Sequence, residues 1–158
     1  MIKKIGMLSL AILLGLSLVP NLKAQGSPYD QYLTIADIEK ATGLTGVKRV
    51  PREPRKGAGG NLNFANQNGD MILIVSFLTK ADYGFYKSTE GMLKEPVKGL
   101  GDEAFIGPGS STPVYMLVIL KGDKCLALST FPKPDDPDKT RLTMDQVIAI
   151  GKVVIGRM

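Results

Sequence analysis

Two runs of consecutive apolar residues constrain the fold of this chain more than any other feature of its sequence. They are Met71–Val75 and Tyr115–Leu120. A strand with one face in water alternates apolar and polar residues, whereas a strand that is apolar at every position is buried on both faces. We therefore expect the sheet centre to be covered on both sides. Helices on one face alone would leave the other needing a partner subunit, a long loop or an apolar ligand.

Two turns predict that these runs belong to antiparallel hairpins. Asn68-Gly69-Asp70 precedes the first run, and Lys121-Gly122-Asp123 follows the second. Short turns that contain Asn-Gly or a central glycine are typical of hairpins. The strands predicted in this way cover residues 47–50, 62–64, 71–78, 104–106, 114–120 and 124–131.

The first and last predicted helices begin alike. Thr34 is placed to cap the first helix, and Thr143 and Gln146 have the spacing of a capping box for the last. In both, the leucine before the threonine is positioned to pack onto an apolar residue of the next turn, Ile38 or Val147.

A weaker helix is predicted between them at residues 81–93, because Gly84 and Gly91 lower its propensity and Pro96 stops it. The element order then reads αβββ, αβββ, α. This order predicts an α+β fold with a mainly antiparallel sheet of about six strands, helices packed on it, and an internal duplication.

Apolar residues at helical spacing form a stripe along the last helix. The stripe consists of Met144, Val147, Ile148, Gly151, Val154, Ile155 and Met158, and Ile150 and Val153 lie beside it. Gly151 would allow the helix to approach the sheet closely. We interpret the stripe as a broad core face, with a contact surface for a second subunit as the alternative.

Residues 1–24 have the parts of a secretory signal peptide. Lys3 and Lys4 precede an apolar run at 5–19, shorter than the roughly 20 residues of a membrane span, and Pro20 and Ala24 end it. We expect cleavage after Ala24, with a second possible cut two residues later; an uncleaved membrane anchor is the alternative. The mature chain would be one domain, residues 25–158, exported to the periplasm or the extracellular space without a membrane span.

Cleavage changes the charge of the molecule. The whole chain has 20 basic and 15 acidic side chains, and removing Lys3, Lys4 and Lys23 leaves 17 basic ones. A nucleic-acid-binding domain needs a strongly basic surface, which this balance does not provide. We therefore expect no nucleic-acid partner.

The single cysteine, Cys125, rules out an intramolecular disulfide. It lies in a strand-like run, residues 124–129, and we interpret it as a small buried hydrophobic residue. An intermolecular disulfide or a reactive thiol is the alternative, although the sequence supplies no histidine or second cysteine to activate or resolve it.

The chain lacks histidine, which excludes Ser-His-Asp and Cys-His catalysis and zinc sites that contain histidine. Its most conspicuous carboxylates, Asp102 and Glu103, follow Gly99 and Gly101. Adjacent residues of a strand point to opposite faces, so these two are poorly placed to share a proton. We interpret the four residues as a turn motif leading into a strand, and we expect no catalytic residue, metal site or cofactor.

Five basic residues lie within nine positions: Lys48, Arg49, Arg52, Arg55 and Lys56. Arginine in a loop is suited to bidentate contacts with a carboxylate, a phosphate or an anionic polymer of the cell envelope. We predict an anion-binding loop here, with a merely solvated loop as the alternative. The glycines that follow it lack the Gly-Lys-Ser/Thr sequence of a phosphate-binding loop.

The segment Val97–Phe105 contains Gly-Leu-Gly-Asp-Glu-Ala, and the first predicted helix contains Leu33-Thr34 and ends with Ala41-Thr42-Gly43. In these residues the chain resembles small bacterial exported proteins and lipoproteins of uncharacterised function. Some of these carry a similar signature in a duplicated α+β domain akin to extracellular sensor domains. This chain lacks the anchoring cysteine of the lipoproteins, and the resemblance implies no catalytic residues.

The sequence therefore predicts an exported, non-enzymatic binding or interaction module of the bacterial cell envelope. Its expected partner is an envelope protein or a small anionic ligand. The alternatives are a structural homodimer and an enzyme that uses carboxylate and lysine chemistry.

Overall fold

The computed structural model describes residues 27–51, 60–92, 95–108 and 115–158. Within these ranges the chain forms three helices and seven strands. The helices are α1 (Ile35–Thr42), α2 (Lys80–Ser88) and α3 (Met144–Arg157). The strands are β1 (Lys48–Val50), β2 (Asn61–Ala65), β3 (Met71–Thr79), β4 (Glu95–Pro96), β5 (Glu103–Pro108), β6 (Tyr115–Lys121) and β7 (Lys124–Thr130).

The predicted signal peptide lies outside the described residues. None of the helices in the described ranges is long and apolar enough to span a membrane.

The strands form one sheet in the order β1-β2-β3-β7-β6-β5-β4, and every neighbouring pair is antiparallel. This confirms the predicted α+β class and the antiparallel sheet. The strand that the sequence did not predict is β4, which has only two residues and pairs with Phe105 and Ile106 at the edge of the sheet. A segment of two residues that contains a proline carries no alternating pattern.

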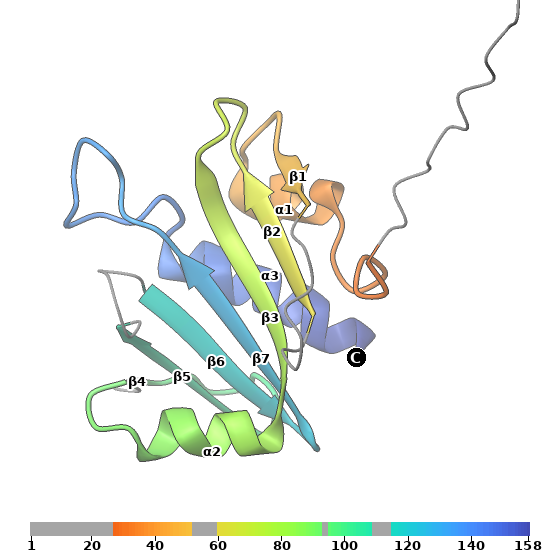
Figure 1. Cartoon of the computed structure of the whole chain (residues 1–158), viewed down its shortest axis with the longest axis vertical. Coiled ribbons are helices and arrows are strands. Elements are labelled where there is room, and N and C mark those ends of the chain that lie inside the picture. Colours follow the sequence, from red (N-terminus) through yellow and green to blue (C-terminus); the bar gives the residue numbers. More distant parts are fainter. Residues whose placement is uncertain (1–26, 52–59, 93–94, 109–114) are drawn as a thin grey trace, which may run out of the picture.

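The strand order divides the sheet into two halves that meet at the central pair, β3 and β7 (Figure 1). One half is β1-β2-β3, and the other is β7-β6-β5 with the short strand β4 at its outer edge. The helices do not follow this arrangement, because α1 and α3 lie on one face of the sheet and α2 lies on the other. An internal duplication therefore describes the strands better than the helices.

A large core fills the space between the sheet and the pair α1 and α3. We use this name for the buried cluster Leu33, Ile38, Val47, Leu62, Phe64, Ile72, Leu73, Val75, Phe77, Leu100, Ala104, Leu117, Ile119, Leu126, Leu128, Leu142, Val147, Ile150 and Val154. Leu33 and Leu142, the leucines before the helix caps, belong to it together with their predicted partners Ile38 and Val147.

A small core lies on the opposite face beneath α2. It consists of the buried residues Tyr83, Met116, Val118, Leu120, Cys125 and Ala127, with Leu78, Tyr86 and Phe105 packed against them. Helix α2 crosses only one end of this face, at the lower edge of the sheet in Figure 1. The prediction that both faces of the central strands are covered is therefore confirmed at the α2 end of β6 and β7.

Helix α3 packs closely on the sheet because Gly151 has no side chain. A Cβ atom at Gly151 would lie 3.1 Å from side-chain atoms of Leu117 and Ile119. The predicted stripe is slightly rotated in the structure, since Ile150 is fully buried whereas Ile148 and Ile155 are only partly buried.

Helix α2 begins one residue earlier and ends sooner than the predicted range 81–93. Its start is fixed by a capping box in which the Asp82 N–H donates to Thr79 Oγ1 and the Thr79 N–H donates to Asp82 Oδ2. At its end, Thr89 has extended backbone angles, and Gly91 has a φ of +77°. The weak helix is therefore confirmed, and its Thr79 cap is a feature that was not predicted.

Candidate functional site

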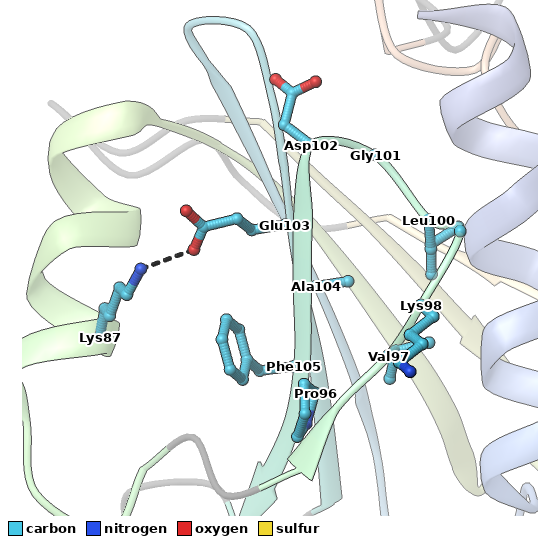
Figure 2. Close-up of a pocket in the computed structure, with 11 residues that line it drawn as sticks. Lys87, Pro96, Val97, Lys98, Leu100, Gly101, Asp102, Glu103, Ala104 and Phe105 are labelled. Atoms are coloured by element: carbon cyan, nitrogen blue, oxygen red, sulfur yellow. Dashed lines mark hydrogen bonds and ion pairs between the residues drawn. The ribbon is translucent and has the colours of Figure 1, made fainter.

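A shallow groove between α2 and the turn before β5 forms a candidate site. It has a volume of about 410 Å³. Its walls carry charges of both signs, from Lys87, Lys98, Asp102 and Glu103, together with the apolar side chains of Val97 and Phe105. Figure 2 shows Lys87 and Glu103 on the α2 side of β5, and Lys98 and Leu100 on the turn at its other side. The Gly-Leu-Gly-Asp-Glu-Ala motif thus forms most of one wall.

The glycines of this turn are needed for its backbone. Gly99 and Gly101 have φ angles of +72° and +65°, in the left-handed region that favours glycine. A Cβ atom at Gly101 would also collide with the carbonyl oxygen of Leu120. Between the two glycines, Leu100 is buried in the large core, so the turn is held from beneath.

The carboxylates of Asp102 and Glu103 are used separately. Asp102 Oδ2 accepts a hydrogen bond of 2.6 Å from the backbone N–H of Gly122, in the β6–β7 turn. Glu103 lies on the α2 side of β5 and does not share this contact. As predicted for adjacent residues of an extended segment, the two carboxylates point apart and contact different partners.

Glu103 connects β5 to helix α2. Its Oε2 atom accepts hydrogen bonds from Tyr83 Oη at 2.8 Å and from Lys87 Nζ at 2.6 Å. The Lys87 ammonium also lies 5.9 Å from the ring centroids of Tyr83 and Phe105. One carboxylate oxygen, one ammonium and two aromatic rings therefore form a compact cluster at the groove.

The cluster keeps Glu103 ionised. The hydrogen bond from Lys87, followed by that from Tyr83, lowers the pKa of Glu103. Burial and the nearby carboxylate raise the pKa of Tyr83 well above its ordinary value of 10.0. Tyr83 thus stays protonated and donates its hydrogen to the carboxylate.

A carboxylate beside a lysine is the arrangement that the enzyme alternative requires, and the groove contains one. The direction of the Glu103 pKa shift does not suit acid–base work, because a carboxylate with a lowered pKa is a weak base and is not protonated near neutral pH. The geometry favours an ion pair that joins two elements of the fold.

The predicted anion-binding loop is only partly described. Lys48 and Arg49 lie on β1, whereas Arg52, Arg55 and Lys56 lie outside the described residues. Lys48 Nζ donates to the Gln67 carbonyl at 3.0 Å. Anion binding by the loop stays a prediction.

Arg49 is engaged within the molecule. It forms an ion pair of 3.3 Å with Asp30, and its guanidinium lies 5.1 Å from the ring centroid of Phe64. The charge of Arg49 is therefore partly compensated by a residue that sequence reasoning did not connect with it.

Cys125 has no exposed surface and lies in the small core beneath α2. Burial raises the pKa of its thiol to about 12. The interpretation of Cys125 as a buried hydrophobic residue is confirmed, and this environment does not favour a reactive thiolate.

Within residues 27–51, 60–92, 95–108 and 115–158, no group of three or more Asp, Glu, His or Cys side chains lies close enough to hold a metal ion.

Sequence reasoning singled out Asp102 and Glu103 but missed Tyr83 and Lys87. These two partners precede Glu103 by 20 and 16 residues and come from a helix whose position on the sheet is a tertiary property. The one available signal was the spacing of Tyr83 and Lys87, four residues apart and so on one face of a helix.

Comparisons with known proteins do not add a function. No protein-family model matches this chain, and no curated protein and no solved structure matches it significantly.

Proposed function

We propose that this protein is an exported, non-enzymatic binding or interaction module of the bacterial cell envelope. The observation that carries the proposal is the groove between α2 and the 96–102 turn, which presents ammonium and carboxylate groups beside apolar side chains. Asp102 accepts a hydrogen bond from the β6–β7 turn, and Glu103 is paired with Lys87. Carboxylates that are engaged in this way fit a binding surface better than proton transfer. Export rests on the signal-peptide pattern of residues 1–24.

The groove suits contact with a partner because its two sides are fixed differently. The turn is held by Leu100 in the large core and by Asp102 on the β6–β7 turn. The helix side is more exposed, since the Lys87 side chain keeps 52% of its surface in contact with solvent. A well-held wall beside an exposed charged side chain is a common setting for recognition.

Native mass spectrometry of processed protein, released gently from the envelope fraction of its host, tests this proposal. We expect a bound small molecule or protein on the wild type. The charge reversal Lys98→Glu at the groove should remove that mass, while the matched reversal Lys152→Glu, on the exposed side of α3, should leave it bound.

The other outcomes are equally informative. Retention by Lys98→Glu together with loss on the double change Arg52→Glu and Arg55→Glu would move the site to the basic loop. A bare homodimer would support the structural alternative, and a bare monomer in every sample would contradict a binding module.

A further inference from the structure

Helix α2 is attached to the sheet unequally along its length. At its start it continues directly from β3, where Thr79 pairs with Lys124, and the Lys80 N–H donates to the Asp123 carbonyl at 2.9 Å. Farther along, the polar contacts between the helix and the sheet are those of Tyr83 and Lys87 with a single carboxylate, Glu103. The first turn of α2 is therefore anchored by backbone, and the rest is held by side chains.

Little apolar surface of α2 is buried. Tyr83 is its one buried residue and Tyr86 is partly buried, whereas Phe85 is exposed to solvent. The small core beneath the helix is separated from the large core by the sheet itself. Displacing α2 would remove the cover of the small core and leave the packing of α1 and α3 intact.

We propose that α2 is a hinged cover, which opens from the sheet as a unit while the large core stays folded. One hinge is at Thr79, where strand and helix join. The other is at Gly91, which has a φ of +77° and open space where a side chain would begin. The small-core residues of the sheet that opening uncovers are apolar: Met116, Val118, Leu120, Cys125 and Ala127. Local opening of a weakly packed element is a general property of folded proteins.

Cys125 reports this motion directly, because it is the single cysteine of the chain and lies fully buried beneath α2. The experiment measures the rate at which Ellman's reagent labels the full mature protein, as a function of urea concentration. We expect labelling in low urea to proceed far faster than global unfolding permits, with a urea dependence much weaker than that of global unfolding.

Three variants sharpen the measurement. Tyr83→Phe keeps the ring but removes the hydrogen bond to Glu103, and should speed labelling in low urea about fivefold. Lys87→Met removes the exposed ion pair and should speed it about twofold. The control Asp37→Asn weakens the contact of α1 with α3 on the opposite face and should leave labelling in low urea unchanged.

The proposal is overturned if wild-type labelling has the urea dependence of global unfolding, or if Tyr83→Phe has no effect on its rate. It is also overturned if Asp37→Asn speeds labelling by the same factor as it raises the global unfolding constant. Circular dichroism of each variant establishes that it is folded before labelling begins.

Discussion

The face of the sheet that carries α1 and α3 and the face that carries α2 differ in how much they bury. Among the described residues, the large core has 19 buried members and the small core has six. Two capped helices cover the first face, and Gly151 brings one of them close to the strands. The second face is covered at one end by a helix with a single buried side chain, Tyr83. The comparison indicates a rigid scaffold on one side and a surface suited to change and contact on the other.

The largest expected difference between the two faces is the cost of truncating a leucine. Leu126 is fully buried in the large core, and Leu120 is 8% exposed in the small core. We expect Leu126→Ala to lower the free energy of unfolding by about 4 kcal/mol and Leu120→Ala by about 2 kcal/mol, because the second site can relax toward a movable helix. Urea denaturation measures both, and equal losses would mean that the faces are equally well packed.

The next largest effect is expected at the glycine turn before β5. Gly101→Ala should lower the free energy of unfolding by about 3 kcal/mol, because the left-handed φ costs about 1–2 kcal/mol and the new Cβ meets the Leu120 carbonyl. Gly99→Ala is the matched control, since Gly99 also has a positive φ but no atom within 4 Å of the Cβ position. We expect a loss of only about 1 kcal/mol there. Urea denaturation of the two variants separates the cost of the left-handed φ from the cost of the collision with Leu120. Similar losses of stability in both would contradict the close approach of Gly101 to Leu120.

A smaller effect is expected on the α1 and α3 side. Arg157 donates to both oxygens of Asp37, at 2.6 and 2.8 Å, and this contact lowers the pKa of Asp37 far below its ordinary value of 3.8. Asp37→Asn should lower the free energy of unfolding by about 1 kcal/mol at neutral pH, a modest effect because solvent screens a partly exposed pair.

The pH dependence of this contact has a definite sign. Ionised Asp37 stabilises the folded chain above its ordinary pKa of 3.8, and this stabilisation is lost as the pH falls below that value. The difference in stability between wild type and Asp37→Asn should therefore shrink on acidification. Denaturation at a series of pH values checks this, and a constant difference would contradict the ion pair.

The smallest effect is expected at the α2 face. The pKa of Glu103 is lowered from 4.5 first by Lys87 and then by Tyr83. Carboxyl NMR titration should therefore find a higher Glu103 pKa in Lys87→Met and a smaller increase in Tyr83→Phe. The ion pair adds stability above pH 4.5 that is lost as the pH falls. An unchanged Glu103 pKa in both variants would mean that the carboxylate does not hold α2.

Much of the fold could be predicted because its signals are local. The Thr143 and Gln146 capping box, the glycine turns of both hairpins and the apolar strands each lie within a few residues of sequence. These features fix where elements begin and end. They do not determine on which side of the sheet a helix packs, and the opposite placement of α2 could not be read from them.

The candidate site was less predictable for the same reason. The turn motif was visible, and its glycines and Asp102 have the structural roles expected of a turn leading into a strand. The contacts of Glu103 with α2 and of Arg49 with Asp30 join residues 16 to 20 positions apart through tertiary packing. Prediction from sequence found one partner of each contact and missed the other. The family resemblance of the Val97–Phe105 segment stays a prediction.

Native-state hydrogen exchange, followed amide by amide in low urea, tests the central claim that the two faces differ in stability. We predict that the amides of α2 exchange through an opening of low free energy with little urea dependence, while those of α3 and β7 exchange only through global unfolding. Exchange of α2, α3 and β7 with one common free energy and one common urea dependence would contradict the account.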